Sequence, residues 1–178
     1  THSYLHIYEK YLASYRKKEN TMLEIGVMGG HSIVLWNYYL PQTKIIGMDI
    51  NYSYLAVNFD NNENVKLLTM DGTDPETPKT LNTYFDIILD DASHFQHHQI
   101  QTLDIFLPYV KEGGIYIIED IETSYWTNSE CYGYPTNYGI DSKKSIVNSF
   151  FVLTHWLNRE FLREKQKNNL EKKIKSIG

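Results

Sequence analysis

Residues 21–30 have the sequence TMLEIGVMGG, in which an apolar segment runs directly into three glycines. The segment Thr21–Gly26 has the length and the apolar content of a buried strand. Glycines directly after a strand allow a tight turn and let the backbone approach a ligand closely. Helical character follows at Ser32–Tyr39. This stretch therefore predicts a strand–turn–helix unit, a building block of α/β folds.

Four more segments downstream have strand character, and helical patterns separate several of them. Such alternation is typical of parallel βαβ units, so we expect an α/β fold with a doubly wound parallel sheet. One of the segments, YFDIILD, is strongly apolar, which indicates burial on both faces of that sheet. The predicted strands are Lys44–Asp49, Val65–Thr69, Tyr84–Asp90 and Gly113–Glu119, with a helix at Gln96–Leu107.

The remaining segments flank this core. Tyrosine and leucine residues at helical spacing between Tyr4 and Tyr15 predict an amphipathic N-terminal helix. Thr123–Asp141 has no clear periodicity, which predicts a long loop, and helices are expected at Ser142–Glu160 and Phe161–Lys175. No strand is expected after these helices, so the sheet would lack its final strands. Together with a first residue other than Met, this indicates a domain excised from a longer chain.

Composition narrows the class of protein. The net charge of −5 over 178 residues argues against nucleic acid as the main partner. A basic stretch at residues 158–178 is interpreted as a solvated helix. No apolar run approaches the roughly 18 residues of a membrane span. The single cysteine, Cys131, excludes an internal disulfide framework and favours a reducing, cytoplasmic compartment.

The strand ends hold the first functional signals, because open α/β sheets bind ligands beyond the carboxyl ends of their strands. The first strand ends in Glu24 and the glycine turn, the second in Asp49, and the third is followed by Asp71 and Gly72. The turn does not match the dinucleotide pattern G-x-G-x-x-G. In this order and spacing, the strand ends resemble those of class I S-adenosylmethionine (SAM)-dependent methyltransferases, with a Rossmann-like sheet. That resemblance implies cofactor binding by Glu24, Gly26, Gly29, Gly30, Ser32, Asp49, Asp71, Gly72 and Asp90.

Acidic residues gather after the fourth and fifth predicted strands. Asp91 follows the fourth strand, and Glu119 and Asp120 lie at the end of the fifth. Neighbouring carboxylates repel one another unless a cation is present, and oxygen ligands suit Mg²⁺, with Mn²⁺ and Ca²⁺ as alternatives. We therefore interpret these three acids as metal ligands. The alternative is that they cap helices or face water, a structural role that Asp90 could take, with Ser93 as the helix N-cap.

Three of the seven histidines lie close together at His94, His97 and His98. We interpret His94 as a general base, because the pKa of histidine lies near working pH. His98 is expected to line an acceptor site, and His97 to be an ordinary surface residue. The spacing of His94 and His98 would let them share a helix face and bind zinc, but the glutamate of H-E-x-x-H is missing.

Two longer motifs are similar to those of the macrocin and mycinamicin type of sugar O-methyltransferase. They are LDDASHFQHH at residues 89–98 and IIEDIETSYW at 117–126, and the resemblance extends over most of residues 1–126. It implies SAM- and Mg²⁺-dependent methylation of a sugar hydroxyl, with Asp91, Glu119 and Asp120 on the metal and His94 as base. Ala92 replaces the glycine that is usual in that family, and no macrolide-specific region is evident.

The resemblance also indicates how the chain is organised. We expect a single methyltransferase domain with an N-terminal helix (1–20), a cofactor and metal core (21–122), an aromatic acceptor loop (123–141) and C-terminal helices (142–178). In the loop, Tyr125 and Trp126 would bind a sugar or glycan acceptor, together with Tyr132, Tyr134 and Tyr138. Alternatively, Tyr125 and Trp126 would be core residues that anchor the loop. Fusion to glycosyltransferase domains and a homo-oligomer are both compatible with the sequence.

Three other functions use the same residues. The first is metal-dependent methylation of catechols or small phenols. The second is a SAM-binding module without catalysis. The third is an iron-dependent hydroxylase-like protein, which would need Asp91, His94 and His98 to form a facial triad.

Overall fold

The structure, a computed structural model, describes residues 4–126, 129–131, 134–136, 139, 141–142 and 145–167. Contacts within the chain divide it into two compact units. The first unit contains the residues up to Ala92 together with Ile105–Ile118, and the second contains Ser93–Asp104 and the residues from Glu119 onward.

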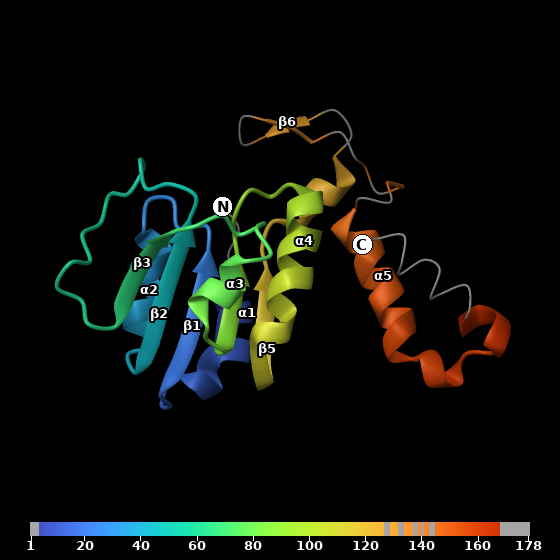
Figure 1. The fold of residues 1–178 in the computed structure, drawn as a ribbon, viewed down its shortest axis with the longest axis horizontal. Helices are drawn as coiled ribbons and strands as arrows, with labels where there is room; N and C mark the ends of the chain where they lie inside the picture. Colours follow the sequence, from blue (N-terminus) through green and yellow to red (C-terminus); the bar gives the residue numbers. More distant parts are fainter. Residues whose placement is uncertain are drawn as a thin grey trace. The chain divides into compact units, whose positions relative to one another are not determined.

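A five-stranded parallel sheet forms the centre of the first unit (Figure 1). The strand order is β3-β2-β1-β4-β5, so the order reverses beside β1, and β1 and β4 are neighbours. Ligands of open α/β sheets bind at such a reversal. The sheet confirms the predicted α/β, Rossmann-like fold class. Its strands are β1 (Asn20–Ile25), β2 (Thr43–Asp49), β3 (Val65–Thr69), β4 (Phe85–Asp90) and β5 (Val110–Ile118).

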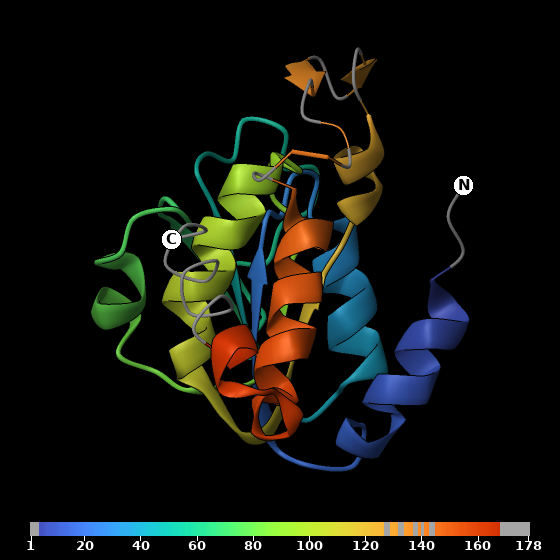
Figure 2. The same ribbon diagram turned by 90° about the vertical axis from the view of Figure 1, so that its right-hand side faces the viewer.

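Helices cover both faces of this sheet (Figure 2). On one face, α1 (Leu5–Leu12) and α2 (His31–Tyr39) pack through Tyr8 and Trp36, whose rings meet edge to face at 4.8 Å between centroids. The short α3 (Thr77–Leu81) lies on the other face. The central strands are therefore buried on both sides, which explains their nearly continuous apolar sequence.

Two apolar clusters occupy the two faces. Successive residues of a strand point to opposite faces, so Met22 of β1 lies in one cluster and Leu23 in the other. The second cluster also contains Phe85 of β4 and Phe106 at the end of α4, both fully buried. These packed faces hold the carboxyl ends of the strands in place.

The second unit contains η3 and the segments that follow it. Its two short strands pair antiparallel, with Cys131 opposite Tyr134, and α5 contacts η3. Most of α4 belongs to this unit, while its last two residues belong to the first. The elements are α4 (Gln96–Phe106), η3 (Ile121–Tyr125), β6 (Ser129–Cys131), β7 (Tyr134–Thr136), α5 (Ile146–Leu157) and η4 (Arg159–Phe161); η1 (Ala13–Tyr15) and η2 (Leu107–Tyr109) lie in the first unit.

Most predicted elements are confirmed within a few residues, but there are differences. The sequence did not predict α3, β6 or β7. The prediction of a helix from residue 161 onward is wrong at its start, because Leu162 has an extended backbone (φ −85°, ψ 143°) after η4. Residues 168–175 of that predicted helix lie outside the described residues. Among the described helices, none has the length and apolar character needed to cross a membrane.

Candidate active site

The turn after β1 is tied closely to the segment after β4. Gly26 has a left-handed backbone (φ 92°), and a Cβ at this position would collide with the Asp91 carbonyl oxygen. The Asp91 backbone N–H donates to the Ile25 carbonyl at 2.9 Å, and the Gly26 N–H donates to Met48 at 2.8 Å. Only glycine fits here, because both the backbone conformation and the available space exclude a side chain. The turn therefore has a fixed shape beside the end of β4.

The carboxylate of Asp49, at the end of β2, shapes the same turn. Its Oδ2 accepts the backbone N–H of Val27 at 2.8 Å and that of Met28 at 2.9 Å. Met28 has a left-handed backbone (φ 46°), which costs a non-glycine residue about 1 kcal/mol. The two charge-assisted hydrogen bonds stabilise that conformation. Asp49 thus has a structural function in the turn, in addition to the ribose contact expected from the sequence.

Glu24 is a buried acid without an ion-pair partner among the described residues. Its side chain is 0% exposed, and neither carboxylate oxygen makes a hydrogen bond of ordinary geometry within the described chain. Burial raises the pKa of Glu24 to about 8; the Ser32 side chain opposes this shift, and the negative charge of Asp91 adds to it. A buried carboxyl group of this kind is costly unless a ligand satisfies it. Glu24 is therefore a candidate ligand-binding group.

The other expected cofactor residues occupy loops, a strand end and the first turn of α2, where Ser32 lies. Gly30 is the N-cap of α2 with a left-handed backbone (φ 83°), and the Gly29 carbonyl accepts the N–H of Ala56 at 3.1 Å. Asp90 is buried at the end of β4, where its Oδ2 accepts the Tyr116 hydroxyl at 3.4 Å. This contact agrees with a structural role for Asp90.

Asp71 lies after β3 and turns the chain by a local hydrogen bond. Its Oδ1 accepts both the backbone N–H of Thr73 at 2.8 Å and the Thr73 hydroxyl at 2.7 Å. Such an Asx turn is a common device for reversing the chain. It leaves Asp71 exposed and Gly72 half-buried in the loop where the sequence placed an adenine contact.

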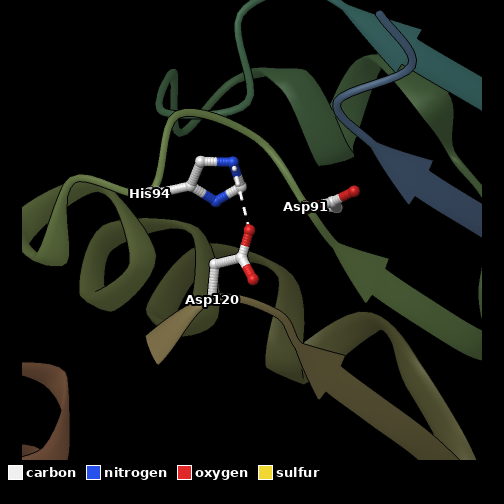
Figure 3. Close-up of side chains that lie close together, drawn as sticks. All are labelled: Asp91, His94 and Asp120. Carbon is white, nitrogen blue, oxygen red and sulfur yellow. Dashed lines mark ion pairs between the residues drawn. The ribbon is translucent and has the colours of Figure 1, made fainter. Parts of the chain in front are cut away.

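In the second unit, His94 faces Asp120 (Figure 3). Nε2 of His94 lies 3.6 Å from Oδ2 of Asp120, and both side chains are largely buried. Both residues have left-handed backbones, with φ of 55° and 51°. Burial lowers the pKa of His94, while the negative charges of Asp120 and Glu122 oppose that shift. The imidazole is therefore biased toward its neutral form, which can accept a proton.

Glu119 precedes Asp120, and its environment disfavours a charge. Burial raises the pKa of Glu119 to about 7, and the adjacent charge of Asp120 adds to the shift. Two such acids side by side are more stable with a cation nearby. Asp91 comes from the first unit, where the residue before it, Asp90, lies in register with Ile118 of β5.

His94 and His98 do not share a helix face, because α4 begins at Gln96 and His94 precedes it. Nδ1 of His98 instead hydrogen-bonds the Ser93 hydroxyl at 2.7 Å. Ser93 makes this contact instead of the helix N-cap contact that the sequence predicted. His97 is half-buried, with its ring centroid 4.2 Å from that of His98, so it is part of a ring cluster.

The aromatic residues of the expected acceptor loop are partly described. Tyr125 ends η3 and is 58% exposed, which excludes the alternative that it is a core residue. Trp126 is half-buried, and its carbonyl accepts the N–H of Gly139 at 2.9 Å. Tyr134 begins β7. Tyr132 and Tyr138 lie outside the described residues.

Sequence reasoning missed two buried glutamines of α4. Gln96 donates to the Thr123 carbonyl at 2.7 Å, and Gln99 donates to the Glu119 carbonyl at 3.0 Å. Both are less than 5% exposed. The sequence shows only two amide side chains three residues apart at the start of a predicted helix. The same spacing suits exposed glutamines.

The sheet, the glycine turn and the acids at the strand ends define an open α/β protein, a class that binds its ligands where the strand order reverses. Residues 23–121 match the family described as methyltransferase domain. The chain therefore belongs to the methyltransferase domain family.

The curated relatives are named as O-methyltransferases. Demethylmacrocin O-methyltransferase of Streptomyces fradiae is 31% identical over 129 residues, which cover 67% of this chain and 32% of that one. Mycinamicin VI 2''-O-methyltransferase of Micromonospora griseorubida is 29% identical over 161 residues, covering 80% and 38%. The chain thus spans about a third of the length of these relatives. The resemblance stated from the sequence motifs is confirmed.

A solved structure of similar sequence has the same fold. The MycE methyltransferase of the mycinamycin biosynthetic pathway, in complex with Mg and SAH, is 30% identical, with a TM-score of 0.64 over 70% of this chain and 36% of that one. A methyltransferase of Podospora anserina bound to SAH is 20% identical (TM-score 0.56, covering 71% and 57%) and shows the fold alone.

Proposed function

We propose that the protein transfers a methyl group from SAM to a sugar hydroxyl with the help of a divalent metal ion. The observation that best supports this function is the buried pair of His94, which follows β4, and Asp120, which follows β5 next to the acid Glu119. A proton acceptor and candidate metal ligands are thereby combined in a chain of the methyltransferase domain family.

The end of the first strand fits SAM. Glu24 offers a buried carboxyl group without a hydrogen-bond partner of ordinary geometry in the described chain, and Gly26 leaves backbone where a Cβ would not fit. SAM has both an ammonium and a sulfonium group, so its binding would place a positive charge near the Glu24 carboxyl group. We propose that Asp49 contacts the ribose, and that Asp71 and Gly72 lie near the adenine. Gly29, Gly30, Ser32 and Asp90 complete the proposed cofactor-binding set.

We propose that Asp91, Glu119 and Asp120 hold the metal. Asp91 and Glu119 directly follow the last paired residues of β4 and β5, which are neighbours in the sheet. Two residues separate Asp91 from His94. Asp120 adjoins Glu119 in the chain, and its Oδ2 lies 3.6 Å from Nε2 of His94. Mg²⁺ prefers oxygen ligands, so we assign the carboxylates to the metal and His94 to proton transfer.

The chemistry follows from these groups. A bound divalent cation would lower the pKa of the sugar hydroxyl, and SAM would supply the methyl group. We propose that Asp120, whose Oδ2 lies 3.6 Å from Nε2 of His94, helps to hold the ring, and that this imidazole takes the proton of the hydroxyl. Burial lowers the pKa of His94, which favours the neutral imidazole needed for that step. General-base catalysis of this type contributes typically about 10²–10⁴-fold.

The sugar acceptor is proposed from the relatives, because the name of one of them describes O-methylation of a rhamnosyl tetracenomycin C. The exposed ring of Tyr125 and the half-buried ring of Trp126 support it, because aromatic faces stack on sugar rings. His98, held by Ser93, is the proposed polar contact to the acceptor.

Methyl transfer from labelled SAM to a panel of sugars, glycans and catechols tests this function. We expect methylated sugar products with Mg²⁺, loss of product in EDTA and recovery when Mg²⁺ is restored. Full activity in EDTA would contradict the metal, and turnover of catechols alone would contradict the sugar acceptor. SAM binding without turnover on any acceptor or metal would indicate a binding module without catalysis.

A further inference from the structure

Two glutamines of α4 hold the backbone on either side of Asp120. The side-chain N–H of Gln99 donates to the Glu119 carbonyl at 3.0 Å, and that of Gln96 donates to the Thr123 carbonyl at 2.7 Å. These two carbonyls bracket the segment from Asp120 to Glu122. Both glutamines lie in the first turn of α4, immediately after the loop that contains His94.

The orientation of both amides follows from their partners. A backbone carbonyl can only accept a hydrogen bond, so the NH₂ end of each amide must face it. Gln96 is 0% exposed and Gln99 is 3% exposed. Their Oε1 atoms have no hydrogen-bond partner among the described residues. The contacts to Thr123 and Glu119 are therefore the specific interactions of these two amides within the described structure.

The bracketed segment needs such support. Asp120 has a left-handed backbone (φ 51°), a conformation that a non-glycine residue keeps only when its surroundings enforce it. The next residue begins η3, a single 3₁₀ segment without a side-chain cap. Hydrogen bonds are directional, so those from α4 to the Glu119 and Thr123 carbonyls fix the register of this segment on the helix.

We propose that Gln96 and Gln99 are positioning residues that set the separation of His94 and Asp120. His94 is joined to the N-terminal turn of α4 through Phe95, and Asp120 is held to the same turn through the Glu119 and Thr123 carbonyls. The helix thus connects the proposed base to the proposed metal ligand. Asp120 would be presented to a divalent cation in one conformation, so that binding the cation does not require the segment to be ordered first.

This inference rests on the proposed function for its metal, but the held segment can be tested without one. Hydrogen exchange of the amides in Ile121–Trp126, measured on metal-free protein, reports directly on the segment. We expect Gln99→Met and Gln96→Met to accelerate this exchange at least tenfold, with exchange in β1 and β4 unchanged. The matched control is Gln42→Met, the same change at an exposed turn of the first unit.

Metal affinity is the second measurement. Residues that support metal ligands typically contribute about 10–100-fold to affinity, so Mn²⁺ should bind each variant about that much more weakly by calorimetry. SAM affinity should stay within twofold, because Glu24 and Asp49 lie in the other unit. Unchanged exchange in Ile121–Trp126 would overturn the positioning role. If the unaltered protein binds no Mn²⁺, the proposed function fails, while the exchange result still decides the role of the glutamines.

Discussion

Oδ2 of Asp49 accepts the backbone N–H of Val27 at 2.8 Å, so the end of β2 determines the shape of the turn that follows β1. The same oxygen also accepts the next N–H of that turn. An acid at this position would be expected mainly to contact a ligand. Here it also preorganises the backbone against which the ligand would bind.

Replacement of Asp49 by alanine should therefore have two effects. Two backbone N–H groups lose their acceptor, which should lower the free energy of unfolding by about 1–3 kcal/mol. The loosened turn should weaken SAM binding about tenfold or more, measured by calorimetry. Glu63→Ala, which removes an exposed acid of the loop before β3, is the control and should change neither quantity. Unaltered SAM affinity in Asp49→Ala would contradict both the ribose contact and the role in the turn.

Glu24→Gln should remove a pH dependence of stability. The pKa of Glu24 is about 8 in the folded protein and near 4.5 in the unfolded chain. The unfolded chain therefore releases this proton at a lower pH than the folded protein does. The neutral buried acid contributes stability that is fully present below pH 4.5 and is lost as the pH rises toward 8.

Melting temperatures of ligand-free protein between pH 4.5 and 8.5 measure this effect. The unaltered protein should lose stability more steeply than Glu24→Gln over that range, by up to about 1.4 kcal/mol per pH unit. The glutamine variant should consequently be the more stable of the two at pH 8. Parallel curves for the two proteins would show that Glu24 ionises normally in the folded state.

Gly26→Ala should be strongly destabilising. The new Cβ would meet the Asp91 carbonyl oxygen, and φ of 92° strains any residue with a side chain. We expect a loss of about 3 kcal/mol in the free energy of unfolding. Gly113→Ala is the matched control: φ is 75°, but a Cβ meets nothing within 4 Å, so the loss should be about 1 kcal/mol. Equal losses in urea denaturation would show that the close approach to Asp91 is unimportant.

His94→Gln should slow methyl transfer without weakening SAM binding. The amide cannot act as a base near neutral pH, so kcat should fall about 10²–10⁴-fold. SAM affinity should change less than twofold, because the proposed cofactor residues belong to the first unit. His155→Gln, at an exposed position of α5, should leave kcat unaltered. A His94 variant with normal kcat would assign the proton transfer to another group.

The sequence predicted the strands and helices that have a local pattern of apolar residues. Each of the five predicted strands is a largely apolar segment of five to seven residues, and the acids at or after their ends mark the edge where parallel strands finish. Chain order and strand ends were enough to select Asp49, Asp91 and Asp120 as candidates. The division into four parts, a fusion partner and a homo-oligomer stay predictions.

What the sequence could not predict depends on contacts between distant residues. The hydrogen bonds of Asp49 connect the end of β2 with the turn after the neighbouring strand β1, and those of Gln96 and Gln99 connect α4 with residues 27 and 20 positions later. Neither has a local pattern. The left-handed backbone of His94 was also invisible, because His94 and His98 have the spacing of a continuous helix.

The approach of Gly26 to the carbonyl of Asp91 also constrains how this protein can evolve. Because backbone atoms of two loops meet there, a substitution at one position cannot be accommodated by a different rotamer at the other. The turn after β1 and the segment after β4 should therefore diverge together among descendants of this chain. Laboratory recombination that exchanges one of these loops without the other should yield few folded progeny.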